Sequence, residues 1–238
     1  MFNKVIVSVV GSSNSGKTTA IEVLIKALTK KGYTIASAKR IPDDDFTIDT
    51  RGKDTYKHSK AGANPVLSVA PKELTIIKKV DTSKLSFEQL IAQIPEETDI
   101  IILEGFKGLV GEDSSIPKIV SAKTADEISE APNRYKNILA FSTAIENPPQ
   151  TEIPIINAKK EPEKLVELVH KKVAVLVERK REREEKITIQ LEEQILPLGE
   201  FVQNIVRNAV LGMVGSLKGA KIKGEEKVSI VIKQLKRG

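Results

Sequence analysis

The chain has 238 residues, of which 40% are apolar, so it can bury a substantial core in one large domain or in one domain with a small appendage. It has no cysteine, which excludes disulfides and thiolate metal sites, and only two histidines. Its charges (net +6) are interspersed and only 4% of its residues are aromatic, which disfavours nucleic acid as a ligand. Its apolar runs fall short of the roughly 20 residues of a membrane span and no signal peptide precedes the first strand, so we expect a cytoplasmic protein with no membrane partner.

The first 38 residues predict a strand, a glycine-rich loop, a helix and a second strand. Residues 5–10 are β-branched and nearly all apolar, which is typical of a parallel strand covered on both faces. Apolar residues at helical spacing follow the loop, and Gly32 ends that pattern. Residues 33–38 predict the second strand, so the segment is a βαβ unit.

The middle of the chain alternates between strand and helix patterns. A polar segment, acidic in its middle, covers residues 39–60, and residues 66–69 and 74–77 then predict a hairpin. Ser86 and Gln89 have the spacing of a capping box, which predicts a helix that ends at Pro95. Further strands are expected at residues 99–103, 118–120, 138–141 and 153–156. This order predicts an α/β fold, a doubly wound and mostly parallel sheet of the P-loop NTPase type, over residues 1–177.

The last part of the chain predicts a separate small module. A long helix is expected from residue 162 to about 186, and its final residues, 178–186, are almost entirely charged and form a helical linker. Beyond it, residues 187–191 predict a strand, 201–217 an amphipathic helix and 228–232 another strand. Residues 187–238 are therefore expected to form a small strand-helix-strand module that buries little by itself.

The loop GSSNSGKT between the first strand and the first helix has the G-x4-G-K-[ST] spacing of a phosphate-binding loop. In such a loop, backbone N–H groups and the positive end of the helix dipole bind phosphate, a lysine reaches the β- and γ-phosphates, and a Ser or Thr hydroxyl binds Mg²⁺. A buried strand before the loop and an amphipathic helix after it satisfy both structural requirements of the motif. The expected ligand-binding residues are Gly11, Ser12, Ser13, Asn14, Ser15, Gly16, Lys17, Thr18 and Thr19.

Two carboxylates are candidates for the magnesium environment. Glu104 ends the hydrophobic strand beginning at residue 99, at the place where P-loop proteins hold the magnesium shell, and Gly105 can offer its N–H near the γ-phosphate. Thr18 and Glu104 are expected metal-site residues, and Lys17 and Glu104 are expected catalytic residues. The acidic loop after the second strand contributes Asp49 or Asp54, with a simply solvated loop as the other interpretation.

These segments resemble the MobB family of GTP-binding accessory proteins of molybdopterin guanine dinucleotide synthesis. The likeness rests on GSSNSGKTT at residues 11–19, DFTIDTRGKDTYKHSKAGA at residues 45–63 and DIIILEGFK at residues 99–107, and it covers roughly residues 1–175. The resemblance implies GTP and Mg²⁺ as ligands, with Asp49 and Glu104 in the magnesium environment and Lys39 near the nucleotide. It also implies slow GTP hydrolysis and a role in helping a nucleotidyltransferase, the molybdopterin guanylyltransferase, to join GMP to molybdopterin.

The chain departs from the family pattern after Lys39, where Arg40 and Ile41 stand in place of the usual histidines. No Asn-Lys-x-Asp guanine-reading motif is present, so guanine specificity depends on the resemblance. Two rival functions remain open. A small-molecule kinase needs several lid arginines, whereas residues 122–148 contain only Arg134, and a metal-delivery GTPase of the same class usually carries a Cys/His site.

A homodimer is expected, because the hairpin at residues 66–80 presents strand edges beyond what a P-loop core needs. The resemblance also implies pairing at that hairpin. The apolar stripe of the C-terminal helix is a second candidate surface, and the other interpretation, which we favour slightly, is that it packs on its own two strands or on the P-loop domain. That stripe consists of Phe201, Val202, Ile205, Val206, Ala209, Val210, Met213, Val214 and Leu217.

Overall fold

The computed structural model describes residues 4–184, 189–191, 194–196 and 198–217. The chain divides into two compact units, residues 1–177 and residues 178–238, which are described separately below. Among the described residues, none of the helices combines the length and the apolar character that crossing a bilayer requires.

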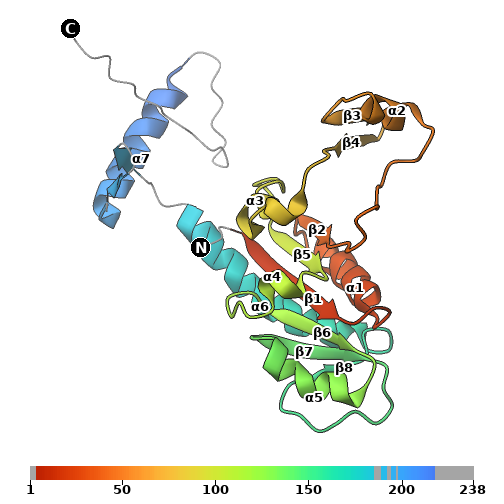
Figure 1. Cartoon of the computed structure of the whole chain (residues 1–238). Helices are drawn as coiled ribbons and strands as arrows, with labels where there is room; N and C mark the ends of the chain where they lie inside the picture. Colours follow the sequence, from red (N-terminus) through yellow and green to blue (C-terminus); the bar gives the residue numbers. More distant parts are fainter. Residues whose placement is uncertain (1–3, 185–188, 192–193, 197, 218–238) are drawn as a thin grey trace. The chain divides into compact units, whose positions relative to one another are not determined.

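The first unit is built on a six-stranded sheet whose neighbouring strands are all parallel (Figure 1), which confirms the predicted fold class. The strand order is β2-β5-β1-β6-β7-β8, so the chain passes from one side of β1 to the other between β5 and β6. In such sheets, ligands bind at the carboxyl ends of the strands beside this reversal. The strands are β1 (Val5–Gly11), β2 (Ile35–Lys39), β5 (Ile100–Glu104), β6 (Lys118–Ala122), β7 (Ile138–Thr143) and β8 (Ile155–Ile156).

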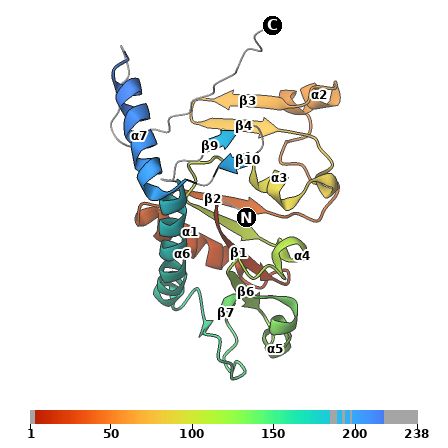
Figure 2. The same cartoon turned by 90° about the vertical axis from the view of Figure 1, so that its left-hand side faces the viewer.

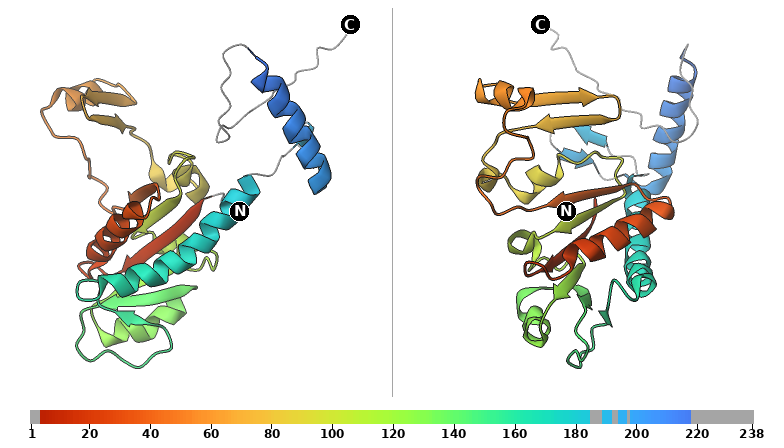
Figure 3. Two further views of the ribbon diagram at one scale, coloured as in Figure 1. Left: turned by 180° about the vertical axis from the view of Figure 1, so that it is seen from behind. Right: turned by 90° about the vertical axis from the view of Figure 1, so that its right-hand side faces the viewer.

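Helices cover both faces of this sheet. Val5, Val7 and Val9 of β1 pack with α1 (Lys17–Lys30) and α6 (Pro162–Glu184), which lie on the same face in Figure 3. Ile6 and Val10, which alternate with them, face the opposite layer. That layer contains α3 (Phe87–Ile91), α4 (Lys107–Val110) and α5 (Ala125–Arg134). Both faces are covered, and β1 is apolar except for Ser8 and Gly11, which agrees with the nearly all-apolar strand predicted at residues 5–10.

The register of the strands gathers the candidate residues at one edge. In the ladders, Val9 of β1 lies opposite Glu104 of β5, and Glu104 lies opposite Lys39 of β2. On the other side of β1, Gly11 lies opposite Ser121 of β6. The phosphate loop therefore starts between the ends of β5 and β6.

The predicted hairpin forms a separate two-stranded antiparallel sheet of β3 (Val66–Ala70) and β4 (Glu73–Ile77) (Figure 2). The Asn64 side chain closes its open end, since its Nδ2 donates to the Lys79 carbonyl at 2.8 Å and its Oδ1 accepts from the Lys79 N–H at 2.9 Å. A short helix, α2 (Asp54–Lys60), contacts β3. After the hairpin come the 3₁₀ helix η1 (Thr82–Lys84) and α3, whose capping box between Ser86 and Gln89 confirms the prediction.

Three helices lie where the sequence predicted only connections, namely α2, α5 and the four-residue α4. α2 lies in the polar segment after β2, and none of its residues is buried, so it has no apolar periodicity to detect. α5 contains Pro132, which weakened the helical pattern, but Thr124 caps it by accepting from the Glu127 N–H at 3.2 Å. The spacing of Thr124 and Glu127 is that of a capping box, and this signal could have predicted the helix.

In the second unit, α6 continues as a helix through Glu184, so most of the predicted charged linker is helical. The single predicted strand is replaced by an antiparallel pair, β9 (Ile189–Leu191) and β10 (Gln194–Leu196), followed by α7 (Glu200–Gly215). The predicted strand at residues 228–232 lies outside the described residues.

Candidate phosphate and metal site

The phosphate loop begins with a glycine that no other residue can replace without strain. Gly11 has a φ of +146°, and a Cβ atom built on it would lie 2.1 Å from the Ser121 carbonyl oxygen. This close approach of β1 to β6 leaves no room for a side chain. The turn of the loop is thereby held against the end of β6.

The rest of the loop exposes donors. Asn14 and Gly16 have positive φ values of 57° and 89°, and Gly16 caps α1 in the left-handed conformation without a side-chain bond. In the described part of the chain, the N–H groups of Asn14, Ser15 and Gly16 donate no backbone hydrogen bond. The first turn of α1 contains no acidic residue, so nothing opposes the positive end of its dipole. The loop therefore offers free N–H groups to an anion.

One side-chain hydroxyl within the loop is also available. The Ser15 Oγ atom is buried and has no hydrogen-bond partner in the structure, whereas the Ser12 hydroxyl interacts with the Glu127 carboxylate. Buried hydroxyls normally have a hydrogen-bond partner, and an oxygen atom of a bound ligand would supply the one that is missing here. Ser13, Asn14 and Thr19 are exposed, as expected for the rim of such a loop.

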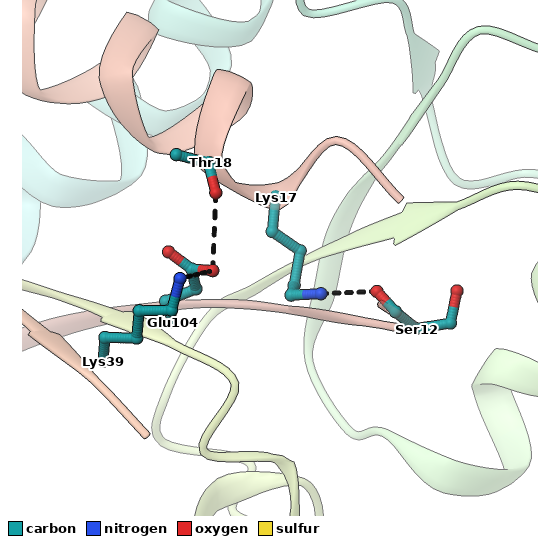
Figure 4. A network of polar contacts seen from close by, with 5 residues as sticks. All are labelled: Ser12, Lys17, Thr18, Lys39 and Glu104. Atoms are coloured by element: carbon teal, nitrogen blue, oxygen red, sulfur yellow. Dashed lines mark hydrogen bonds and ion pairs between the residues drawn. The ribbon is translucent and has the colours of Figure 1, made fainter. Parts of the chain in front are cut away.

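Lys17 lies inside the loop, where its ammonium group donates to the Ser12 carbonyl oxygen (Figure 4). Burial lowers its pKa; the Glu104 carboxylate opposes this shift, whereas the ammonium groups of Lys39, Lys107 and Lys123 add to it. A neighbouring anion would relieve both the burial and the repulsion. Lys17 therefore lies where it could contact a phosphate bound in the loop.

Glu104 joins the loop to the end of β2. Its Oε1 lies 3.5 Å from the Thr18 hydroxyl and 3.2 Å from the Lys39 ammonium, and both side chains point to it in Figure 4. The Glu104 side chain is only 14% exposed, against 58% for Lys39. The structure thus brings together Lys17, Thr18, Lys39 and Glu104, which lie far apart in the sequence.

The residues present fit a magnesium ion bound together with a phosphate. The Thr18 hydroxyl and the Glu104 carboxylate are hard oxygen ligands on the same side of the loop, and Mg²⁺ takes most of its remaining ligands from phosphate and water. The described residues contain no cluster of three or more His, Cys, Asp or Glu side chains that could hold a metal alone. Lys39 and Thr18 both contact Oε1 of Glu104, so an ion that used this oxygen as a ligand would compete with the Lys39 ammonium.

Two predicted residues lie differently from the expectation. The N–H of Gly105 donates to the Val9 carbonyl at 3.2 Å, so it is not free to bind a γ-phosphate unless that bond breaks. Asp49 accepts from the Thr50 N–H and the Thr55 hydroxyl through Oδ1, and no bond joins it to Thr18 or Glu104. The structure therefore does not bring Asp49 into the cluster around Glu104.

Lys107 and Lys123 were not predicted as site residues. Lys107 begins α4 three residues after Glu104, and Lys123 directly follows β6, so both belong to the edge that carries the phosphate loop. Both ammonium groups are close enough to Lys17 to affect its pKa. Their places after two strands that flank β1 could have indicated them once the strand order was known.

The remaining candidates have other roles. Arg134 pairs with Glu130 within α5, and its side chain is 65% exposed. The Tyr33 hydroxyl lies 3.3 Å from His170 Nε2, which joins α6 to the segment before β2, and His58 is exposed on α2. Neither histidine belongs to the site.

Comparison with known proteins agrees with this geometry. The profile of the family described as "MobB: Molybdopterin guanine dinucleotide synthesis protein B" matches residues 6–144, which is more than half of the chain. This stretch contains the phosphate loop, the Glu104 strand and the hairpin.

The names of similar curated proteins refer to the same biosynthesis. The chain is 34% identical over 122 residues to a putative molybdopterin-guanine dinucleotide biosynthesis adapter protein of Methanocaldococcus jannaschii, covering 51% of this chain and 48% of that protein. It is 31% identical over 128 residues to a probable adapter protein of the same name from Bacillus subtilis, covering 52% of this chain and 68% of that one. The chain thus spans about half of the first relative and two-thirds of the second.

Solved structures extend the likeness to the fold. A crystal structure of molybdopterin-guanine biosynthesis protein B is 26% identical and has a TM-score of 0.55, with 71% of this chain and 99% of that one covered. The structure of Bacillus subtilis MobB gives 26% identity and a TM-score of 0.55 over 70% of this chain and 96% of that one.

Proposed function

Because this chain belongs to the MobB family, we propose that it is a GTP-binding adapter protein of molybdenum cofactor biosynthesis. Its curated relatives are named as adapters in the synthesis of molybdopterin guanine dinucleotide. In this proposal, the protein assists a guanylyltransferase that joins GMP to molybdopterin and does not itself make that bond.

The observation that carries the proposal is the phosphate loop. Its unused N–H groups, the unpartnered Ser15 hydroxyl and the Lys17 ammonium all belong to the loop that leads into α1. Charge-assisted bonds from such groups bind triphosphates strongly. On binding, Lys17 would leave the Ser12 carbonyl for the β- and γ-phosphates.

We further propose that Thr18 and Glu104 hold Mg²⁺ when the nucleotide is bound. When bound, the ion would supply positive charge that stabilises the negative charge of the phosphates during hydrolysis. Thr18 would bind the ion through its hydroxyl, and Glu104 would orient the ion's water shell. Hydrolysis should be slow, since among the described residues no hydrogen bond or ion pair holds an arginine or glutamine side chain at Thr18 or Glu104.

The β3–β4 hairpin supports a homodimer as part of this function. Leu67 lies opposite Ile76 and Val69 opposite Leu74, so the four side chains share one face of the hairpin. They are 55–75% exposed in the protomer. A second copy of the chain would cover this apolar face and its strand edges.

A nucleotide titration tests the main proposal. The full-length protein, titrated with GTP and with ATP in the presence and absence of Mg²⁺, should bind GTP more tightly than ATP, and Mg²⁺ should strengthen binding. Failure to bind either nucleotide would contradict the proposed function. Co-purification with a molybdopterin guanylyltransferase tests the adapter role, and a chain that binds GTP without ever retaining that enzyme would contradict it.

A further inference from the structure

The geometry of the phosphate loop sets the direction in which a bound nucleotide extends. Thr18 and Glu104 lie on the β5 side of β1, which is the side of the γ-phosphate and its metal ion. Beyond them, the Lys39–Glu104 pair occupies the end of β2. The ribose and base must therefore extend in the other direction, over the ends of β6, β7 and β8.

The spacing between the strands indicates which strands would lie under the base. Neighbouring strands are about 4.8 Å apart, so the end of β7 lies about 10 Å from the end of β1, which is about the reach of a ribose and base beyond the phosphates. β7 and β8 are parallel neighbours, with Phe141 opposite Ile155 and Ser142 opposite Ile156. The turns that follow these two strands thus lie together at the place that a base would occupy.

The turn after β7 presents a carboxylate. Thr143 is buried at the end of the strand, and its hydroxyl accepts from the Ile145 N–H at 3.1 Å. Ile145 packs on the core cluster that contains Phe141 and Val120. Glu146 follows this anchored residue, is exposed, and has no hydrogen bond or ion pair in the described part of the chain.

The turn after β8 presents a backbone donor. Asn157 Oδ1 accepts from the N–H groups of Lys159 and Lys160 at 3.0 and 3.1 Å, which fixes a tight turn directly after Ile156. Between them, Ala158 is only 5% exposed, and its N–H donates to no acceptor among the described residues. Buried donors without a partner are rare, so this N–H is a candidate for a ligand oxygen.

We propose that these two turns read guanine, with Glu146 accepting from N1–H and the 2-amino group and the Ala158 N–H donating to O6. Adenine cannot form these hydrogen bonds, because it has an acceptor at N1 and a donor at its 6-position. Glu146 is then the specificity-determining residue of the chain, in place of the missing Asn-Lys-x-Asp motif. This inference rests on the proposed function, which places a nucleotide triphosphate in the phosphate loop.

The test compares nucleotides that differ only in these groups. Full-length wild-type protein should bind GTP at least ~10-fold more tightly than either inosine triphosphate or ATP. Inosine triphosphate lacks the 2-amino group, and the loss of one hydrogen bond to a charged acceptor has about this effect. Glu146→Gln should weaken GTP at least ~10-fold and strengthen xanthosine triphosphate by a similar factor, because the new amide donates to the 2-carbonyl of xanthine. A gain for xanthosine triphosphate cannot result from misfolding.

Glu152→Gln is the matched control, since it removes an exposed carboxylate from the same connection between β7 and β8. It should change none of these affinities. The inference is overturned if Glu146→Gln leaves the ranking of the nucleotides unchanged, if Glu152→Gln shifts it equally, or if the wild type binds GTP and ATP alike. Binding of GTP with an unchanged ranking in Glu146→Gln would leave the proposed function standing, whereas a wild type that binds no triphosphate overturns both.

Discussion

The strands of the central sheet and the strands of the β3–β4 hairpin have similar composition and opposite surroundings. β1 and β5 are rich in Val and Ile, and helices on both faces leave these side chains almost wholly buried. In the hairpin, Val69 is 75% exposed and Leu74 is 63% exposed. The same residue types thus build a core in one region and an open surface in the other.

This difference shows which part of the molecule is complete in one protomer. The sheet needs nothing further to bury its apolar residues, and the buried polar groups without a partner include Ser15 in the phosphate loop and Ser121, which lies opposite Gly11. The hairpin keeps its backbone pairing but leaves apolar area uncovered. Exposing such an apolar patch to water is unfavourable. The phosphate loop of the sheet is therefore suited to a polar ligand, and the hairpin to an apolar partner.

The largest effect is expected at the loop. Lys17→Ala should weaken GTP binding by at least ~100-fold, because it removes a charge-assisted bond to the phosphates. The fold should remain, since the change removes no core volume. Calorimetric titration with GTP measures the loss, and Lys26→Ala, an exposed lysine of the same helix, is the control. Unchanged affinity in a folded Lys17→Ala protein would refute the phosphate site.

A smaller effect is expected at the metal end of the loop. Glu104→Gln should slow Mg²⁺-dependent hydrolysis by ~10-fold or more while changing GTP affinity less, because the loop contacts persist. Wild-type turnover should itself be slow, ~10⁻⁴ to 10⁻² s⁻¹. Single-turnover phosphate release measures both, with Glu97→Gln, an exposed carboxylate before β5, as the control. Normal turnover in Glu104→Gln would reduce Glu104 to a strand-end residue that pairs with Lys39.

The smallest effect per residue is expected at the hairpin. Replacing the cross-strand pair Val69 and Leu74 by serine should raise the dimer dissociation constant by ~10-fold or more, because apolar area would be lost from both protomers. Thermal stability of the protomer and GTP binding should hardly change, since both side chains are exposed there. Sedimentation measures the association.

Phe201→Ser on α7, where the side chain is 76% exposed, separates the two candidate surfaces. If this variant dissociates and the hairpin variant does not, the dimer forms through α7 and the hairpin proposal is wrong. A full-length protein that is monomeric at every concentration tested would contradict dimerisation as a whole.

Local signals predicted much of the first unit. The capping box at Ser86, the glycine stop at Gly32 and the glycine spacing of the phosphate loop each act within a few residues, so they are readable without a fold. α2 was missed because it buries nothing, and the helical pattern of α5 was interrupted by Pro132. Both helices depend on caps and neighbours more than on apolar periodicity.

The sequence by itself determined the sheet class, the phosphate loop and the carboxylate at the end of β5, because hydrophobic period and loop spacing are properties of short segments. Only the tertiary structure decided that Lys39 pairs with Glu104, that the Gly105 N–H is bound to Val9, and that Asp49 lies apart from this cluster. These facts follow from strand order and register. Both are set by how the whole core packs, and no short segment contains that information.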